Sequence, residues 1–254
     1  MDVITLASRK GGAGKSTLTA HLAAHAQAQG HRCLLIDADP QGSVTLWQSL
    51  RKNGEPHLKS AERGITRALA FAQLDNYDYV FIDTAPTLWV TVEEAIRAAT
   101  LVVVPARPGF FDLNAVLETV KTARKLDKPY AVALNAAPAK RDDKESPVVT
   151  SARVFLEGHG VPVWWGQITQ RAGYSLTLAA GGSASEQAED NEAAAAEIAG
   201  LWSSIAKSVA AINAAHAAAK SAASAAGEAE DAGEDAVEET ETAEETESTE
   251  ETES

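Results

Sequence analysis

Cysteine is almost absent from this sequence of 254 residues, in which Cys33 is the only one. A single thiol excludes a disulfide framework within the chain, and it cannot supply the ligands of a cysteine-bridged metal cluster. The sequence also lacks any apolar run approaching the roughly 18–20 residues that a membrane-spanning helix needs. No basic segment followed by an apolar one opens the chain, so the pattern of a signal peptide is missing. These absences predict a cytoplasmic protein.

Positive charge is missing from the C-terminal segment. Residues 227–254 contain 14 Asp and Glu but no Lys or Arg, which accounts for the net charge of −14. The preceding 226 residues carry 22 residues of each sign and are formally neutral. The acidic segment has little apolar surface to bury and its charges repel one another, so we expect it to be disordered. The predicted organisation is a folded domain over residues 1–216 and an Ala-rich, then acidic, disordered tail over 217–254.

Short apolar runs alternate with longer mixed segments along the predicted domain. Strands are predicted at Val3–Ala7, Arg32–Asp37, Tyr79–Asp83, Leu101–Pro105, Tyr130–Asn135 and Val161–Trp165. Helices are predicted at Thr17–Gln29, Val92–Ala99, Leu113–Leu126 and Val148–Glu157, with a final helix that packs on the domain until about His216 through Ile198, Leu201, Trp202, Ile205, Val209 and Ile212. Almost continuously apolar strands between helices predict an α/β fold with a mostly parallel, twisted sheet covered by helices on both faces.

The segment Ser8–Thr17, "SRKGGAGKST", is typical of a phosphate-binding loop between a strand and a helix. Its glycines, Gly11, Gly12 and Gly14, allow the backbone to curl so that its N–H groups point inward, and the helix that follows adds its positive end. Lys15 can reach the outer phosphates of a nucleotide, and the Ser16 hydroxyl can bind Mg²⁺. The pattern departs from the usual G-x-x-x-x-G-K-[ST] in one respect, because Arg9 replaces the first glycine and a second lysine, Lys10, follows it.

Two acidic motifs follow other strands of the predicted sheet. Asp83 ends the apolar run "YVFIDTAP", and a carboxylate in this position can hold Mg²⁺ through a water. Asp37 and Asp39 lie in "LLIDADPQGS", where one carboxylate can support hydrated Mg²⁺ and the other can orient an attacking water. Because ligands of parallel α/β sheets bind at the carboxyl ends of the strands, we expect these side chains to meet the glycine-rich loop.

The combination of "KGGAGKST", "DADPQGS", "FIDTAP" and "VVVPARPGFFDL" resembles the ParA/MinD family of deviant-Walker ATPases, a group of P-loop NTPases. The resemblance covers roughly residues 1–190, and "DPQG" favours the ParA branch. No helix-turn-helix segment precedes Met1, which favours the small form of that branch. The C-terminal segment is acidic, whereas membrane attachment of the MinD type needs a basic amphipathic helix. Stable membrane binding is therefore not expected. The cysteine ligands of the family's iron-protein reductases are missing.

The resemblance implies a role for each motif residue. Lys10 would reach across a nucleotide-sandwich dimer to the phosphates of the partner subunit, and would be catalytic together with Lys15 and Asp39, the residue that positions water. ATP would contact Lys10 to Thr17, including Ala13, and Asn135 would bind the adenine edge; the alternative for Asn135 is a turn residue at a strand end. Mg²⁺ would be held by Ser16, Asp37 and Asp83.

The function that the resemblance implies is a weak, partner-stimulated ATP hydrolase that forms an ATP-dependent homodimer and binds nonspecific DNA on the nucleoid. An adaptor protein would stimulate hydrolysis, and the cargo would be a plasmid, a chromosome or a protein assembly. Two alternatives stay open, a membrane-associated spatial regulator of the MinD type and a scaffold that does not hydrolyse ATP. Arg171 is the first candidate DNA contact, with pairing to a nearby carboxylate as its alternative; Lys207 and Lys220 are weaker candidates.

Overall fold

The computed structural model describes residues 1–87 and 89–247, without the side chains of Trp89 and of residues 225–247. The chain divides into two compact units, Met1–Val209 and Ala210–Ser254. The first unit contains a sheet of six strands in the order β3-β2-β4-β1-β5-β6. The strands are β1 (Asp2–Leu6), β2 (Cys33–Ala38), β3 (His57–Ser60), β4 (Tyr79–Thr84), β5 (Leu101–Ala106) and β6 (Tyr130–Leu134).

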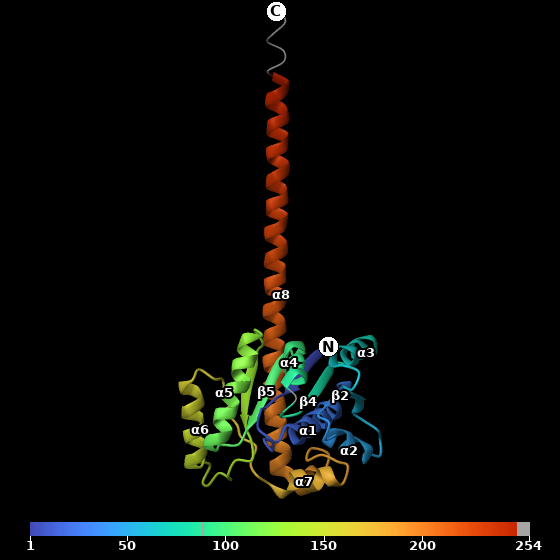
Figure 1. The fold of residues 1–254 in the computed structure, drawn as a ribbon, viewed down its shortest axis with the longest axis vertical. Coiled ribbons are helices and arrows are strands. Elements are labelled where there is room, and N and C mark those ends of the chain that lie inside the picture. The colour runs from blue at the N-terminus through green and yellow to red at the C-terminus, as the bar shows by residue number, and fades with distance from the viewer. Residues whose placement is uncertain (88, 248–254) are drawn as a thin grey trace, which may run out of the picture. The chain divides into compact units, whose positions relative to one another are not determined.

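Every strand pair in this sheet is parallel, as the almost continuous apolar runs predict. Helices lie on both sides of the sheet (Figure 1). They are α1 (Lys15–Ala28), α2 (Ser43–Ser49), α3 (Ile65–Leu74), α4 (Trp89–Ala98), α5 (Phe110–Lys125), α6 (Pro147–Gly158), α7 (Ala172–Ala179) and α8 (Ala188–Glu247). The α/β fold with a parallel sheet between helices is therefore confirmed.

The core consists of two layers because the inner strands of the sheet bury side chains on both of their faces. On β4, Val80 and Ile82 are buried with Ile65 and Ala72 of α3. Phe81, between them in sequence, faces the opposite side, where its ring lies 6.0 Å from that of Trp202 in α8. This alternation follows from the period-two geometry of a strand. Ile198, Leu201, Trp202, Ile205 and Val209 are all buried, so the predicted packing of the final helix on the domain is confirmed as far as Val209. Ile212, the last residue of the predicted set, is only half-buried.

The compact unit ends at Val209, before the predicted domain boundary at residue 216, and α8 continues to Glu247. The helical backbone therefore extends into the segment 217–254, for which disorder stays a prediction. Alanine, glutamate and lysine have high helix propensities, which favour a helical backbone in this segment. The disorder predicted for the acidic tail falls partly on residues 248–254, which lie outside the described residues.

The predicted strand Val161–Trp165 is wrong. This segment makes only one isolated parallel bridge, between Val132 and Val163. Arg153 of α6 donates to the carbonyl oxygens of Trp164 and Trp165, at 2.6 and 3.0 Å, and therefore occupies acceptors that a longer ladder would use. The sequence patterns also miss α2, α3, α7 and β3. The last of these is a short edge strand with an exposed, polar pattern rather than an apolar run.

Candidate functional site

The glycine-rich loop between β1 and α1 forms one wall of a cavity of about 550 Å³. Gly12 and Gly14 adopt positive φ angles of 71° and 97°, a conformation that side chains other than glycine rarely adopt. Gly14 is also the residue that precedes the first turn of α1. A Cβ atom at Gly14 would collide with the side-chain amide of Asn135, so the loop needs glycine here for two reasons.

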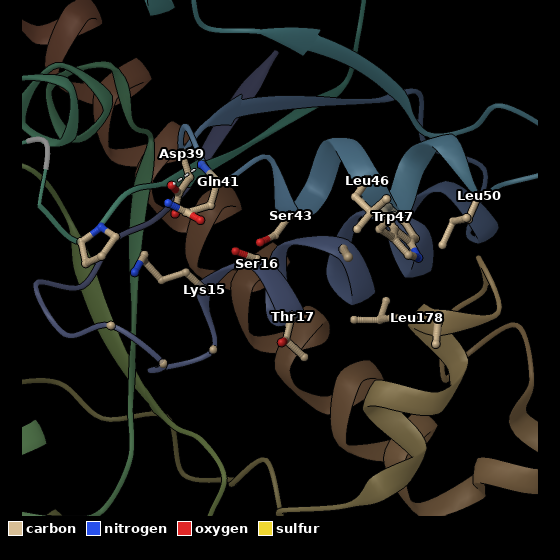
Figure 2. Close-up of a pocket in the computed structure, with 16 residues that line it drawn as sticks. Lys15, Ser16, Thr17, Asp39, Gln41, Ser43, Leu46, Trp47, Leu50 and Leu178 are labelled. Carbon is tan, nitrogen blue, oxygen red and sulfur yellow. Dashed lines mark hydrogen bonds between the residues drawn. The ribbon is translucent and has the colours of Figure 1, made fainter.

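Lys15 lies at the polar end of the cavity, although its side chain is largely withdrawn from solvent. Burial lowers the pKa of its ammonium group, while the nearby carboxylates of Asp83 and Asp39 act in the opposite direction. Ser16, Asp39 and Gln41 line the same end of the cavity, as Figure 2 shows. A buried lysine at the start of a helix, facing a hollow with glycine backbone on its other side, is suited to bind an anion with several negative oxygens.

Asp83 is the penultimate residue of β4 and is fully buried, and within the described residues neither of its carboxylate oxygens has a hydrogen-bond partner. Burial raises the pKa of Asp83 to about 7, against the opposing influence of the Ser16 hydroxyl and the Lys15 ammonium. An unpartnered buried carboxylate costs free energy unless a cation or a donor reaches it. The pair of Asp83 and Ser16 therefore fits a divalent cation. The described residues contain no group of three or more His, Cys, Asp or Glu that could hold a metal, so the other ligands of such a cation would have to come from nucleotide and water.

Asp37 and Asp39 are close together in the sequence, but their side chains have different surroundings. Asp37 lies opposite Asp83 in the register of β2 and β4. One oxygen of Asp37 accepts hydrogen bonds from the backbone N and the hydroxyl of Thr45, at 2.9 and 2.6 Å, and so fixes the first turn of α2. Asp39 lines the cavity and accepts one hydrogen bond from the backbone N of Gln41 at 3.0 Å. The carboxylate that is free to act in the cavity is thus that of Asp39, and Asp37 positions the segment that carries it.

Five predicted site residues lie outside the lining of this cavity, namely Ala13, Asp37 and Asp83 together with Lys10 and Asn135. Lys10 is exposed and is not among the described residues that line it. Asn135 is buried behind the loop, where its amide nitrogen donates to the carbonyl oxygen of Ala13 at 2.7 Å. The structure therefore gives Asn135 a contact that braces the loop, and its contact with adenine stays a prediction.

The far end of the cavity is apolar, a feature that no sequence motif indicated. Leu46 and Trp47 of α2 and Leu50, the residue after α2, face Leu178 of α7 there (Figure 2). The indole nitrogen of Trp47 donates to the carbonyl oxygen of Gly182 at 2.9 Å, which ties α2 to the chain after α7. The only sequence signal was a cluster of large apolar residues directly after "DPQGS", and it has no spacing that distinguishes a cavity wall from a core.

Arg171, the first candidate DNA contact, is paired with a carboxylate. Its guanidinium nitrogens lie 2.9 and 3.3 Å from Oε1 of Glu197, and Glu197 also accepts from the Tyr174 hydroxyl at 2.7 Å. The structure therefore contains the alternative stated for Arg171, pairing with a nearby carboxylate. Lys207 and Lys220 are exposed on α8.

His21 and His25, spaced like metal ligands on α1, have structural partners instead. The ring nitrogens of His21 lie 3.2 Å from the carbonyl oxygen of Tyr174 and 3.2 Å from the backbone N of Ala184. Nδ1 of His25 lies 2.9 Å from the hydroxyl of Ser185. Both histidines thus attach α1 to the segment between α7 and α8.

The glycine loop, the lysine at the start of α1 and the carboxylates at the ends of β2 and β4 define a nucleotide-binding α/β domain of the P-loop class. The family model for the CobQ/CobB/MinD/ParA nucleotide binding domain matches residues 4–178. The chain therefore belongs to this family. No helix in the described part of the chain is both long enough and apolar enough to cross a membrane.

Relatives within the family include proteins named for positioning and partitioning. The chain is similar to maintenance of carboxysome distribution protein A of Gloeobacter kilaueensis, with 36% identity over 123 residues, which are 48% of this chain and 56% of that protein. It is 33% identical over 153 residues to the chromosome-partitioning ATPase Soj of Thermus thermophilus, covering 48% of this chain and 61% of Soj. These matches span less than two thirds of the relatives' length. A solved structure of a Cyanothece McdA variant in complex with ATP superimposes with a TM-score of 0.64 at 18% identity, over 81% of this chain and 96% of that one, and so shares the fold.

Proposed function

We propose that this chain is a ParA-type ATPase that binds ATP with Mg²⁺, closes as a homodimer over two nucleotides, binds nonspecific DNA, and thereby positions a cargo. The observation that carries this proposal is the buried, unpartnered carboxylate of Asp83 beside Lys15 and Ser16. A structural aspartate would have acquired hydrogen-bond donors during folding, whereas a carboxylate that serves a bound cation needs to stay available.

Each residue of the site has a separate task in this proposal. Lys15 binds the outer phosphates of ATP, while Ser16 and Asp83 hold Mg²⁺, which supplies positive charge to the phosphates when it is bound. Asp39 orients the attacking water, because its carboxylate lines the cavity and has few competing hydrogen bonds. Asp37 supports the same region by fixing α2 through Thr45.

Lys10 is proposed to act on the nucleotide of the partner subunit. It is exposed on the outside of the loop rather than in the cavity of its own chain, so its ammonium group is available to a second copy. A cation delivered in this way stabilises the charge of the transferring phosphate only after dimerisation, which would keep hydrolysis slow in the monomer. Stimulation by an adaptor protein and association with the nucleoid belong to the same proposal, as does the positioning role suggested by the names of the relatives.

The proposal is tested with the Asp39→Ala variant, in which the water-orienting carboxylate is lost but the phosphate-binding loop is intact. We expect this variant to bind ATP, to accumulate as a dimer in light scattering, and to release phosphate much more slowly than the parent. Asp75→Ala, which removes an exposed carboxylate at the end of α3, serves as the control and should behave like the parent. Phosphate release by Asp39→Ala at the parent rate would contradict the role of Asp39. A parent protein that binds ATP without hydrolysing it would instead support the scaffold alternative.

A further inference from the structure

A second hollow, separate from the nucleotide cavity, is lined by positive charge. Its volume is about 380 Å³, and it lies where β3 leads into α3. Lys59 comes from β3, Arg63 from the connecting loop and Arg67 from the first turn of α3, and all three are exposed. Phe71 forms an apolar wall, with the ammonium nitrogen of Lys59 lying 3.9 Å from the centre of its ring. We call this surface the basic groove; Glu62 is the one carboxylate that lines it.

The three cations of the basic groove have no ion-pair partner among the described residues. This sets them apart from several arginines elsewhere in the domain. Arg51 and Arg153 make close ion pairs with Glu186 and Glu145, at 2.6 and 2.8 Å. The guanidinium of Arg124 binds backbone carbonyl oxygens. The charges of the basic groove are therefore available to a ligand.

The position of the two arginines is locally unfavourable for the isolated chain. Arg67 lies in the first turn of α3, where the helix dipole already places positive charge, and no acidic residue lies in that turn. Arg63, in the loop before α3, adds a second exposed positive charge close to the start of this helix. A negatively charged ligand in the groove would balance both charges. Local conflicts of this kind are expected where a sequence serves a function rather than its own stability.

The basic groove is also connected to the nucleotide site through the sheet. Ser60, at the end of β3, lies opposite Asp37 in the register of β2 and β3. The backbone N of Ala61 donates to the carbonyl oxygen of Asp37 at 3.0 Å. The groove therefore begins beside the carboxyl end of β2, where Asp37 and, two residues later, Asp39 lie. The nucleotide cavity lies on this same side of the sheet, at the carboxyl ends of the strands.

We propose that the basic groove binds the phosphodiester backbone of duplex DNA through Lys59, Arg63 and Arg67. This inference rests on the proposed function, in which DNA is a partner, and it names the surface that makes the contact. Residues 1–226 are formally neutral, so the domain can hold a polyanion only where positive charge is locally in excess. Arginine guanidinium groups match phosphate oxygens in geometry, and exposed unpaired cations of this kind contribute affinity without reading sequence.

The test compares DNA binding by the full-length parent with that by the double variant Arg63→Ala/Arg67→Ala, using fluorescence anisotropy on a mixed-sequence duplex with ATP. The matched control is Arg97→Ala/Arg141→Ala, which removes two exposed arginines outside the groove. We expect the groove variant to bind about tenfold more weakly, and its slope of log affinity against log salt to become shallower by about 0.9 for each phosphate that is no longer neutralised. The control should keep the slope of the parent, and Arg63→Lys/Arg67→Lys should largely restore it.

Other outcomes separate this inference from the proposed function. If the parent binds DNA with ATP and the groove variant binds equally well, the groove assignment is wrong while the function stands. If the parent binds no DNA in any nucleotide state but hydrolyses ATP, the DNA component of the proposed function fails, and this inference fails with it. Tripolyphosphate binding that depends on the two arginines, without any change in DNA affinity, would identify a small phosphate ligand instead. If the groove variant changes DNA affinity in the full-length chain but not in a chain shortened after Ala226, the ligand of the basic groove is the acidic tail rather than DNA. Phosphate release measured on every variant should stay at the parent rate in the absence of DNA.

Discussion

Arg51 and Glu186 form a two-point ion pair that joins the loop after α2 to the segment following α7. The two contacts measure 2.6 and 3.1 Å, and the side chain of Arg51 is only 3% exposed. Burial by itself raises the pKa of Glu186, but the hydrogen bonds and charge of Arg51 outweigh this effect, so the pKa lies below its ordinary value. Because α2 and α7 both line the apolar end of the nucleotide cavity, this pair maintains the shape of the site from outside it.

Removing the arginine of this pair is expected to destabilise the domain. Arg51→Ala removes a buried side chain together with its hydrogen bonds to Glu186 and to the carbonyl oxygens of Glu55 and Gly181, and we expect a loss of about 2–3 kcal/mol in the free energy of unfolding, measured by urea denaturation. Arg51→Lys keeps the charge but not the planar two-point geometry, and should fall between the parent and the alanine variant. Lys52→Ala, at the exposed neighbouring position, is the control. Equal stability of Arg51→Ala and the parent would show that the pair contributes nothing net.

Substitutions of Lys15 and Lys10, the two lysines of the loop, should have different effects. Lys15→Ala removes the ammonium group inside the cavity, and we expect ATP affinity to fall by about tenfold to a hundredfold. Lys10→Ala removes a charge outside the cavity, so it should bind ATP normally but lose dimerisation and turnover. Nucleotide titration combined with light scattering measures both properties. An equal loss of ATP affinity in the two variants would contradict a role for Lys10 in the partner subunit.

Neutralising Asp83 should have opposite effects on the free and the nucleotide-bound protein. In Asp83→Asn the buried carboxylate is replaced by an uncharged group of similar size, so the protein without nucleotide and magnesium should become more stable by about 1–3 kcal/mol. The same change removes the attraction for a divalent cation, so stabilisation by added Mg²⁺ and ATP should shrink. Thermal unfolding with EDTA and with Mg²⁺–ATP tests both halves. A variant that is less stable in EDTA would indicate a purely structural role for Asp83.

His21 should make the stability of the domain depend on pH. Burial lowers its pKa from 6.5 to about 4, against the opposing influence of the Tyr174 carbonyl oxygen and of Glu186. Between these two values the unfolded chain binds a proton that the folded protein does not, so stability falls as the pH decreases from about 6.5 to about 4. The full effect corresponds to about 3 kcal/mol.

The corresponding measurement is urea denaturation across this pH range. His21→Gln should be less stable than the parent near pH 7, since it loses hydrogen bonds to Tyr174 and Ala184, and the difference should narrow as the pH falls. His216→Gln, which changes an exposed histidine, should show the same dependence of the free energy of unfolding on pH as the parent. A constant difference between His21→Gln and the parent would mean that His21 does not titrate differently in the folded state.

The sequence predicted the parts of the molecule in which local pattern and tertiary environment agree. Buried parallel strands such as β4 begin with an almost continuous apolar run, here Tyr79–Ile82, and the glycine-rich loop has a characteristic spacing, so both were identified. Features that depend on a residue far away in the sequence were not identified. The backbone near Trp164 is held by Arg153, and Arg171 is paired with Glu197, 26 residues further along the chain. Asn135 faces the loop because the turn after β6 brings it there, a relationship that no local pattern contains.

Both edges of the sheet are shielded from pairing with another chain. The strand β3 is only four residues long and carries Lys59, and short charged edges discourage strand addition. At the opposite edge, the backbone N of Val132 in β6 donates to the carbonyl oxygen of Pro162, and the backbone N of Trp164 donates to the carbonyl oxygen of Val132, at 2.9 and 2.8 Å. Edge-to-edge growth of the sheet into a fibre is therefore disfavoured at both ends. A protein that is expected to gather in many copies on one DNA surface can thus be crowded there without its sheets joining into aggregates.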